Sequence, residues 1–362
     1  MLTHSGISPR SGSTSSGGDW AEIVRDPNWL PHSYDPQRKA LNFAYLDRRA
    51  RAEATFLDAR HVLHPKWSGF APVERLPEDA INETRGPLHF IFHTSFCCST
   101  LLARAFDQPG ASMGLKEPAV LGHFARDLST GRSAPGAIRA LETTLHLLSR
   151  PLQPNETQIV KPSNVFNALI PQMMHLRPDA KAILLYSSLE SFLRTVARRG
   201  IYGRLFARQL FQAFSVAMPL DVRYPTEELM QQTDMQIAVQ AWLMQIACFR
   251  ALEINYPHRT RTLNSDTLLA DPKTSFAKAC EFFDIDLDDE AQTATVNGPV
   301  FRQHAKQPNV AFDGAAYKRQ QKEADPSAAE VAVALDWGSR LAQQIETPIH
   351  LGDTLLTLGR AN

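Results

Sequence analysis

Hydrophobic and polar positions along this chain follow two periods, and segments of the two kinds alternate. Short strand-forming runs lie at residues 88–92, 112–116, 157–160, 182–186 and 259–263. The first and fourth runs are apolar without alternation, which is typical of strands buried on both faces of a parallel sheet. Helical spacing of apolar residues is found at 119–128, 137–148, 165–176, 189–199, 204–218, 226–254, 273–283 and 328–345. Strands that alternate with helices predict a three-layer α/β sandwich around a mainly parallel sheet.

The residues before the first buried strand have a different character. Residues 1–18 are mostly Ser, Gly, Thr and Pro, which cannot bury enough apolar area to offset the entropy of ordering, so we expect a disordered tail. Residues 19–86 mix aromatic and charged side chains, and a helical pattern covers residues 48–58. We expect a helical extension that packs on the main domain, with 65–86 as a connection. Residues 87–362 then form the α/β domain with helical additions.

Composition limits the classes of partner. Lysine plus arginine equals aspartate plus glutamate at 38 each, so no overall field favours nucleic acid or an anionic membrane. We see no run of ~20 apolar residues and no secretory signal, and we expect a cytoplasmic protein without a membrane span. The four cysteines form neither a disulfide framework nor a metal-ligand pattern, so we predict no metal. Oligomeric state stays open.

The segment PLHFIFHTSFCCSTLL, residues 87–102, gives the clearest local signal. An apolar strand breaks into small polar residues, and helical spacing then begins with Ser99 and Thr100 at N-cap positions. Such a helix start presents unpaired N–H groups and favours an anion such as phosphate or sulfate. The loop contains no glycine and no lysine, so it lacks the G-x-x-x-x-G-K-[ST] pattern of an ATP-binding P-loop. A strand-to-helix turn of small residues is the alternative reading.

Polar residues follow the next strands at the ends where ligands bind in such sheets. Lys116 and Glu117 end the second strand, Lys161 ends the third, and Ser187 ends the fourth. A carboxylate there can accept a proton from an attacking hydroxyl, while a lysine neutralises developing charge. A surface ion pair and a solvated loop lysine are the alternatives.

Further residues are weaker candidates. Thr195 lies four residues before Arg199 on one helix face, with Arg194 and Arg198 beside them, so this face suits a second phosphate or is a solvated basic face. The segment from Arg302 to Lys306, with His304, could close over a phosphate. Cys97 and Cys98 are either redox-sensitive thiols or small residues that fit a tight loop. His93 and His123 are possible acids or bases, or hydrogen-bonded core residues.

The order of these motifs resembles that of the sulfotransferases that use 3′-phosphoadenosine 5′-phosphosulfate (PAPS), particularly divergent bacterial members. HTSFCCSTLL resembles their 5′-phosphosulfate loop, GLKEP their Lys-Glu strand end, and VKPSNVF their Lys-Ser stretch. AILLYSSLESFLRT lies where the family has Arg-Asp-Pro and a helix serine at its 3′-phosphate site. Here Phe96 falls near the position of the loop cation, Cys98 at the loop glycine, Ser187 at the arginine and Thr195 at the helix serine.

The resemblance implies a P-loop nucleotide-hydrolase-like fold and a transfer of a sulfuryl group from PAPS, without a metal. Glu117 would be the general base, with Lys116 and Lys161 as charge-stabilising residues. The acceptor would carry a hydroxyl or an amine, as a small molecule, a glycan or a peptide. The donor would be bound by Thr94, Ser95, Phe96, Cys97, Cys98, Ser99, Thr100, Ser187, Thr195, Arg198, His304 and Lys306. A P-loop kinase or other nucleotide-dependent phosphotransferase is one alternative, and a catalytically degenerate binding protein with the same fold is the other.

Overall fold

The structure is a computed structural model, and it describes residues 20–58, 66–129, 136–222, 224–304, 307–311 and 327–358. The predicted tail, residues 1–18, lies outside the described residues. The predicted division into domains stays a prediction.

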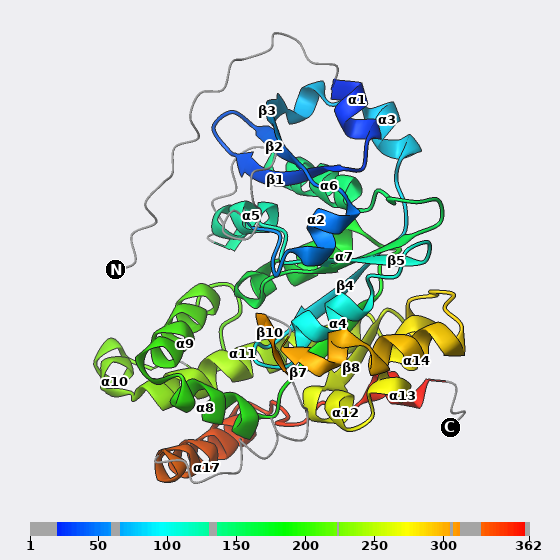
Figure 1. Cartoon of the computed structure of the whole chain (residues 1–362). Helices are drawn as coiled ribbons and strands as arrows, with labels where there is room; N and C mark the ends of the chain where they lie inside the picture. The colour runs from blue at the N-terminus through cyan, green and yellow to red at the C-terminus, as the bar shows by residue number, and fades with distance from the viewer. Residues whose placement is uncertain are drawn as a thin grey trace.

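A five-stranded parallel sheet forms the centre of the molecule (Figure 1). Its strands are β4 (Leu88–His93), β5 (Ser112–Lys116), β6 (Thr157–Lys161), β7 (Ala182–Tyr186) and β8 (Thr260–Asn264). They lie in the order β5-β6-β4-β7-β8, and every neighbouring pair is parallel. The predicted α/β class with a parallel sheet is confirmed, and each predicted strand lies within one residue of its observed bounds.

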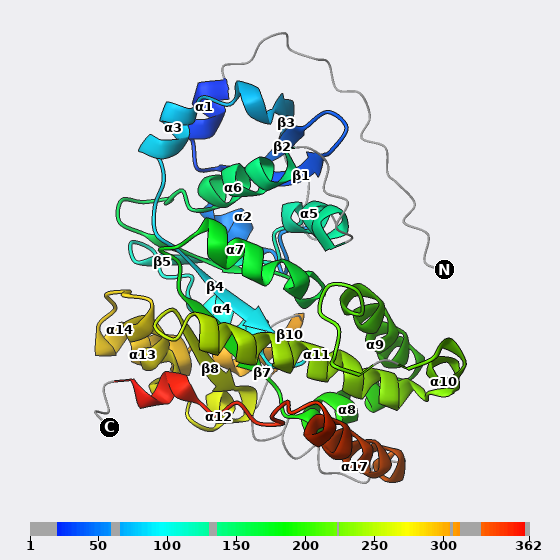
Figure 2. The same ribbon diagram turned by 180° about the vertical axis from the view of Figure 1, so that it is seen from behind.

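The sheet is apolar on both faces because helices cover both. Phe90 and Phe92 of β4 lie in one core cluster, which includes buried residues of α7 (Ile170–Leu176) and α11 (Asp234–Asn255). Ile91 lies in a second cluster with residues of α4 (Ser99–Ala105) and α13 (Pro272–Phe282). Figures 1 and 2 show these two helical layers from opposite sides of the sheet. Alternate side chains of a strand therefore enter opposite cores.

The connections leave the sheet in opposite directions beside β4. The chain passes from β4 to β5 on one side, whereas it passes from β7 to β8 on the other. The neighbours β4 and β7 therefore form a topological switch point, and the crevice outside their carboxyl ends is where ligands bind in open α/β sheets. The loop after β4 lies at this crevice, as do Ser187 and Ser188, which follow β7.

Two predicted helices are interrupted. Residues 165–176 divide into a 3₁₀ helix η2 (Asn164–Leu169) and α7, which has a proline in its first turn. Residues 226–254 divide into α10 (Thr226–Gln231) and α11, because Thr233 begins α11 with a capping box. Its hydroxyl accepts the Gln236 N–H at 3.2 Å, and the Gln236 side chain accepts the Thr233 N–H at 3.0 Å.

Helix α11 is the one helix among the described residues that is long and apolar enough, by length and composition, to cross a membrane, which the sequence analysis does not anticipate. Because 67% of its most apolar window is buried inside the fold, the core helix of a globular protein accounts for the same pattern. The remaining helices are α5 (Val120–Ser129), α6 (Ala137–Leu148), α8 (Leu189–Arg198), α9 (Gly200–Phe214), α12 (Ser265–Ala270), α14 (Asp289–Asn297), α15 (Pro299–Arg302), α17 (Ala328–Gln344) and the 3₁₀ helix η3 (Thr354–Thr357).

The prediction of a helical N-terminal extension is wrong in part. The extension holds a three-stranded antiparallel sheet of β1 (Trp29–Asp35), β2 (Ala40–Tyr45) and β3 (Lys66–Pro72), where β3 replaces part of a predicted connection. Asp35 makes the turn, because its side chain accepts the N–H groups of Gln37 and Arg38 at 2.9 and 3.1 Å. The helices here are α1 (Trp20–Arg25), α2 (Arg48–Glu53), η1 (Val73–Arg75) and α3 (Glu78–Glu83).

Candidate functional site

Backbone strain gathers at the carboxyl ends of β4 and β5. Eight non-glycine residues in the described part of the chain have positive φ, and four of them lie here: Ser95 (75°), Phe96 (53°), Cys98 (58°) and Glu117 (53°). Each such residue costs free energy and persists only where the surrounding structure holds it. Strain at these four positions, none of which is glycine, points to a site that needs their side chains.

The loop after β4 is held by its neighbours. The Thr94 N–H donates to the Leu185 carbonyl of β7 at 3.2 Å, and the Ser187 N–H donates to the Thr94 hydroxyl at 3.2 Å. From η2, the Asn167 amide donates to the His93 carbonyl at 3.0 Å. These bonds fix the loop between β7 and the segment after β6.

The helix after the loop begins with a different cap from the one predicted. Ser99 and Thr100 are the first residues of α4, and Cys98 is its N-cap with no side-chain cap bond. The prediction of Ser99 and Thr100 as caps is wrong because the left-handed conformation of Cys98 turns the chain one residue earlier. Both hydroxyl residues are buried at the base of the loop.

His93 and Cys97 have structural bonds. The Nδ1 atom of His93 accepts the Ser95 N–H at 3.2 Å, so Nε2 carries the proton and donates to the Pro162 carbonyl at 3.1 Å. The Cys97 thiol donates to the Leu185 carbonyl at 3.5 Å, and burial raises its pKa. A thiol with a raised pKa does not suit the redox-sensitive role.

Lys161 and Glu117 form an ion pair at the ends of β6 and β5. The side chain of Lys161 is 1% exposed and that of Glu117 is 19% exposed, so the carboxylate is the accessible member. The Glu117 N–H donates to the Lys161 carbonyl at 2.7 Å, which extends the β5–β6 pairing into the strained residue. Pro162, the residue after Lys161, accepts the His93 Nε2–H at the start of the loop, and β6 pairs with β4, so the ion pair lies beside the loop.

Lys116 is bonded elsewhere. It is the register partner of Lys161, but its ammonium donates to the carbonyls of Arg51 and Ala52 in α2, at 2.8 and 2.9 Å. Burial lowers the pKa of Lys116 to about 8, and Asp107 opposes this shift. The structure thus gives Lys116 a bond to the N-terminal extension, where the sequence analysis expects a charge beside the transferred group.

The residues predicted to bind the 3′ phosphate lie at two places. Thr195 and Arg198 are on α8, and Ser187 precedes the helix. Ser187 is fully buried, and its hydroxyl donates to the Ser95 carbonyl at 3.4 Å. Thr195 donates to the Ser191 carbonyl at 2.8 Å and accepts a bond from the Arg198 guanidinium at 3.3 Å. Arg198 and Thr195 are therefore together on one helix face, whereas Ser187 belongs to the support of the loop.

Arg199, which the sequence analysis names only as a neighbour of Thr195 on one helix face, lies against the loop. Its guanidinium carbon lies 5.1 Å from the ring centroid of Phe96, and the ring also packs on Phe192 and Phe206. An arginine over an aromatic face is a cation–π contact. A positive charge thus lies directly above the loop residue at which a cation is missing. In the sequence, only the four-residue spacing between Thr195 and Arg199 indicated that Arg199 belongs to the site.

Similarity to known proteins is found in the three-dimensional structure. No family model and no curated protein matches the chain. It is similar to a sulfotransferase domain from the curacin biosynthetic pathway, at 13% identity and a TM-score of 0.40, over 73% of this chain and 98% of that chain. A sulfotransferase domain of the Synechococcus PCC 7002 olefin synthase matches at 15% identity and 0.41, over 71% and 96% of the two chains. A sulfotransferase from Mycobacterium tuberculosis matches at 14% and 0.38, over 60% and 73%.

These matching structures are sulfotransferases, as are the proteins that the motifs resemble.

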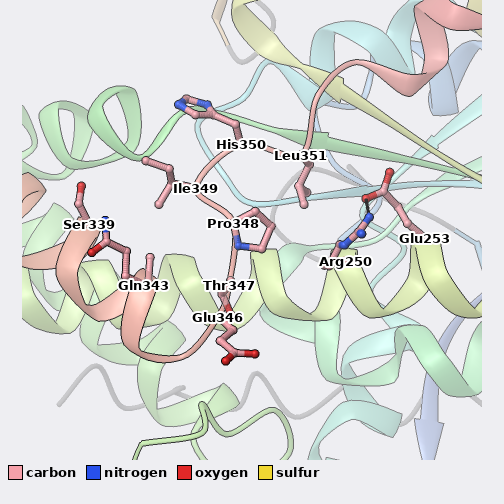
Figure 3. A pocket seen from close by; sticks show the side chains of 11 residues that line it. Arg250, Glu253, Ser339, Gln343, Glu346, Thr347, Pro348, Ile349, His350 and Leu351 are labelled. Carbon is pink, nitrogen blue, oxygen red and sulfur yellow. Dashed lines mark ion pairs between the residues drawn. The ribbon is translucent and has the colours of Figure 1, made fainter.

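Two cavities lie away from the carboxyl ends of the parallel strands. One groove of about 680 Å³ is lined by α11, α17 and residues 346–351, and holds the ion pair of Arg250 with Glu253 at 3.6 Å (Figure 3). A second cavity of about 480 Å³ is lined by residues that include Pro87, His89 and Asp284, at the opposite end of the sheet. Neither is lined by a predicted site residue.

The predicted role of the late basic segment, residues 302–306, stays a prediction, and so does the prediction of no metal. His304 lies in β9 (Gln303–His304), which pairs with β10 (Gln307–Ala311), and Lys306 lies outside the described residues. Among the described residues, no three His, Cys, Asp or Glu side chains are grouped to hold a metal ion. The absence of a metal in the reaction stays a prediction.

Proposed function

We propose that this protein is a sulfotransferase that moves the sulfuryl group of PAPS to a hydroxyl or an amine of an acceptor. The observation that carries the proposal is the Lys161–Glu117 ion pair beside a strained, glycine-free loop at the switch point of a parallel sheet. Loop hydroxyls and N–H groups suit a sulfonate or phosphate, and the pair supplies a base and a cation at the neighbouring strand ends. The lack of a loop lysine disfavours ATP.

In the proposed reaction, the Glu117 carboxylate takes the proton of the acceptor hydroxyl as its oxygen attacks the sulfur of PAPS. The bond between sulfur and the bridging phosphate oxygen breaks, and 3′-phosphoadenosine 5′-phosphate (PAP) leaves with that electron pair. Lys161 stabilises the charge that develops on the bridging oxygen. Because the ammonium of Lys116 is bonded to backbone carbonyls, we assign this role to Lys161 and a structural role to Lys116.

The 3′ phosphate would lie on the basic face of α8. Thr195 and Arg198 are already bonded to each other, and Arg199 is held on Phe96 at the loop. Arg199 would therefore provide the positive charge that the loop itself lacks, and Arg198 would contact the 3′ phosphate. Guanidinium groups suit both tasks because they bind phosphate through paired N–H donors.

Isothermal titration with PAP tests the donor assignment directly. We expect saturable binding in the micromolar range without added metal. If PAP at millimolar concentration gives no binding heat, the donor assignment fails. A screen of acceptor pools with labelled PAPS then identifies the acceptor.

A binding protein without catalysis is the second candidate function. It is favoured by Ser187, which is fully buried with its hydroxyl on the Ser95 carbonyl, where a phosphate-binding arginine is expected. PAP binding without sulfated product from any acceptor pool would support this candidate.

A further inference from the structure

A short segment of the N-terminal extension lies over the proposed catalytic pair. Residues 54–58, which we call the strap, follow α2. The Lys161 ammonium lies 5.4 Å from the ring centroid of Phe56 in this strap. The ammonium that is paired with Glu117 is therefore also in contact range of an aromatic face, which attracts a cation through its quadrupole.

Backbone bonds hold the strap against the strand end. The Leu57 N–H donates to the Lys116 carbonyl at 2.7 Å, and the Leu57 carbonyl accepts the Ala119 N–H at 3.0 Å. The strap thus pairs with the residues on both sides of Glu117, and the Leu57 side chain is fully buried. Lys116 adds bonds to the carbonyls of Arg51 and Ala52, just before the strap.

These contacts have a common result. Glu117 is held in its strained conformation from one side by β6 and from the other by the strap. Lys161 is 1% exposed although it ends a strand at the ligand-binding edge, and the Phe56 ring is one of the groups packed against its ammonium. A lysine kept dry beside a carboxylate interacts with it more strongly than a solvated lysine does.

We propose that Phe56 is a positioning residue of the sulfuryl-transfer site, which holds the Lys161 ammonium beside Glu117, so that the N-terminal extension completes the site. This inference rests on the proposed function for the role of the pair. It makes residues 20–58 part of the catalytic unit, since the strap reaches the site from a separate antiparallel sheet.

The test measures the protection of single lysines in the full-length protein. Acetic anhydride at limiting concentration labels accessible amines, and mass spectrometry gives a rate for each lysine. In Phe56→Ala we expect the labelling rate of Lys161 to rise at least fivefold, while Phe56→Tyr, which keeps the ring, labels like the wild type. Glu117→Gln is the positive control, because it breaks the pair directly.

Phe70→Ala is the matched control. Phe70 lies in β3 of the same extension, where the Arg38 guanidinium carbon is 5.4 Å from its ring centroid. The same change of aromatic to alanine should leave Lys161 labelling within twofold of the wild type. Phe56→Leu keeps most of the side-chain volume but has no aromatic face, and we expect at least a twofold rise. This variant decides the question if Phe56→Ala does not fold, as judged by circular dichroism.

Two results would overturn the inference. One is a Lys161 labelling rate that stays unchanged in the folded Phe56 variants, and the other is a rise in Phe56→Tyr equal to that in Phe56→Ala. PAP titration of the wild-type protein separates the test of Phe56 from the test of the proposed function. Wild-type protein that fails to bind PAP would refute the donor assignment, while the lysine labelling still decides whether Phe56 holds Lys161.

Discussion

The proposed base is a carboxylate on a strained residue, and its strain has a use at the residue scale. Glu117 has a φ of 53°, and its N–H is bonded to the Lys161 carbonyl. The backbone therefore turns at the end of β5, and the side chain meets the ammonium of the neighbouring strand. A glycine would relieve the strain but would remove the carboxylate.

Removal of the carboxylate charge should separate binding from catalysis. In Glu117→Gln we expect sulfated product to form at least ~100-fold more slowly, because a general base contributes about 10²–10⁴ in rate. PAP affinity should change less than twofold, since the carboxylate contacts the acceptor. Labelled PAPS with the acceptor pool measures the first and calorimetry the second. Glu53→Gln, in an exposed pair with Arg49 on α2, is the control. A product yield equal to that of the wild type would refute the base assignment.

Arg199 should carry donor affinity in spite of its exposed position. For Arg199→Gln we expect PAP to bind ~10-fold more weakly, because one charge-assisted hydrogen bond contributes about 1.5–3 kcal/mol and part of it is screened by solvent. Arg194→Gln is the control on the same helix, since the Arg194 guanidinium is bonded to Glu190 at 2.8 Å. Equal PAP affinities of the two variants, measured by calorimetry, would argue against Arg199 as the loop cation.

Sequence alone predicted the residue types at this site better than their contacts. Lys116 and Lys161 stand at equivalent strand ends, and nothing local distinguishes them. The difference comes from the carbonyls of Arg51 and Ala52, which take the Lys116 ammonium from more than sixty positions away in the chain. The role of Phe56 and the contact of Arg199 with Phe96 were not predicted for the same reason: both depend on tertiary packing, and neither residue belongs to a motif.

At the element scale, the central sheet was predictable and the N-terminal sheet was not. Strands buried on both faces leave unbroken apolar runs such as AILLY, which resist other interpretations. The hairpin of β1 and β2 has a proline and a histidine within β1, and its apolar residues are also spaced as a helix allows. The turn at Asp35, followed by proline, was the available signal for a hairpin.

A buried arginine joins the N-terminal extension to the main domain, and its removal should lower the free energy of unfolding. Arg150 is 2% exposed, and its guanidinium donates to the carbonyls of Leu147, Ile23, Val24, Asp26 and Trp29. Arg150→Met leaves these buried acceptors without a donor, so we expect a loss of about 3–5 kcal/mol in the free energy of unfolding. Urea denaturation measures the loss. Arg139→Met, an exposed change on α6, should stay within about 0.5 kcal/mol. An equally small change for Arg150→Met would show that the carbonyls find other donors.

At the scale of the whole molecule, the extension and the parallel sheet share one core. A single cluster contains Leu41 and Phe43 of β2 together with Phe90 and Phe92 of β4 and Trp242 of α11. A shared apolar core couples the unfolding of the parts that it joins. The strap is therefore attached to a rigid body, which is the condition for a positioning role.

Two buried histidines make the stability of the molecule dependent on pH. His32 of β1 and His89 of β4 are 5% and 7% exposed. Burial lowers the pKa of each to about 4, assisted by His123 for His32 and by Lys181 for His89. His89 also accepts the Lys181 N–H on Nδ1 at 3.1 Å, a bond that protonation of Nδ1 would break.

The sign follows from proton binding. Between pH 6.5 and about 4 the unfolded chain binds protons at these histidines that the folded protein does not, so the free energy of unfolding falls as the pH falls through this interval. It is unaffected by them above this interval. Within this interval each histidine changes the free energy of unfolding by up to about 1.4 kcal/mol per pH unit. Over the whole interval the change is about 3 kcal/mol for each histidine.

Urea denaturation between pH 7 and pH 4.5 measures this slope. His89→Gln should flatten it by about 1.4 kcal/mol per pH unit, whatever its effect on stability at pH 7, because one titrating group is removed. His258→Gln, an exposed histidine beyond α11, is the control. A slope in His89→Gln equal to that of the control would mean that His89 binds its proton equally well in the folded protein. The bond to Lys181 would then have to open at acid pH without loss of stability.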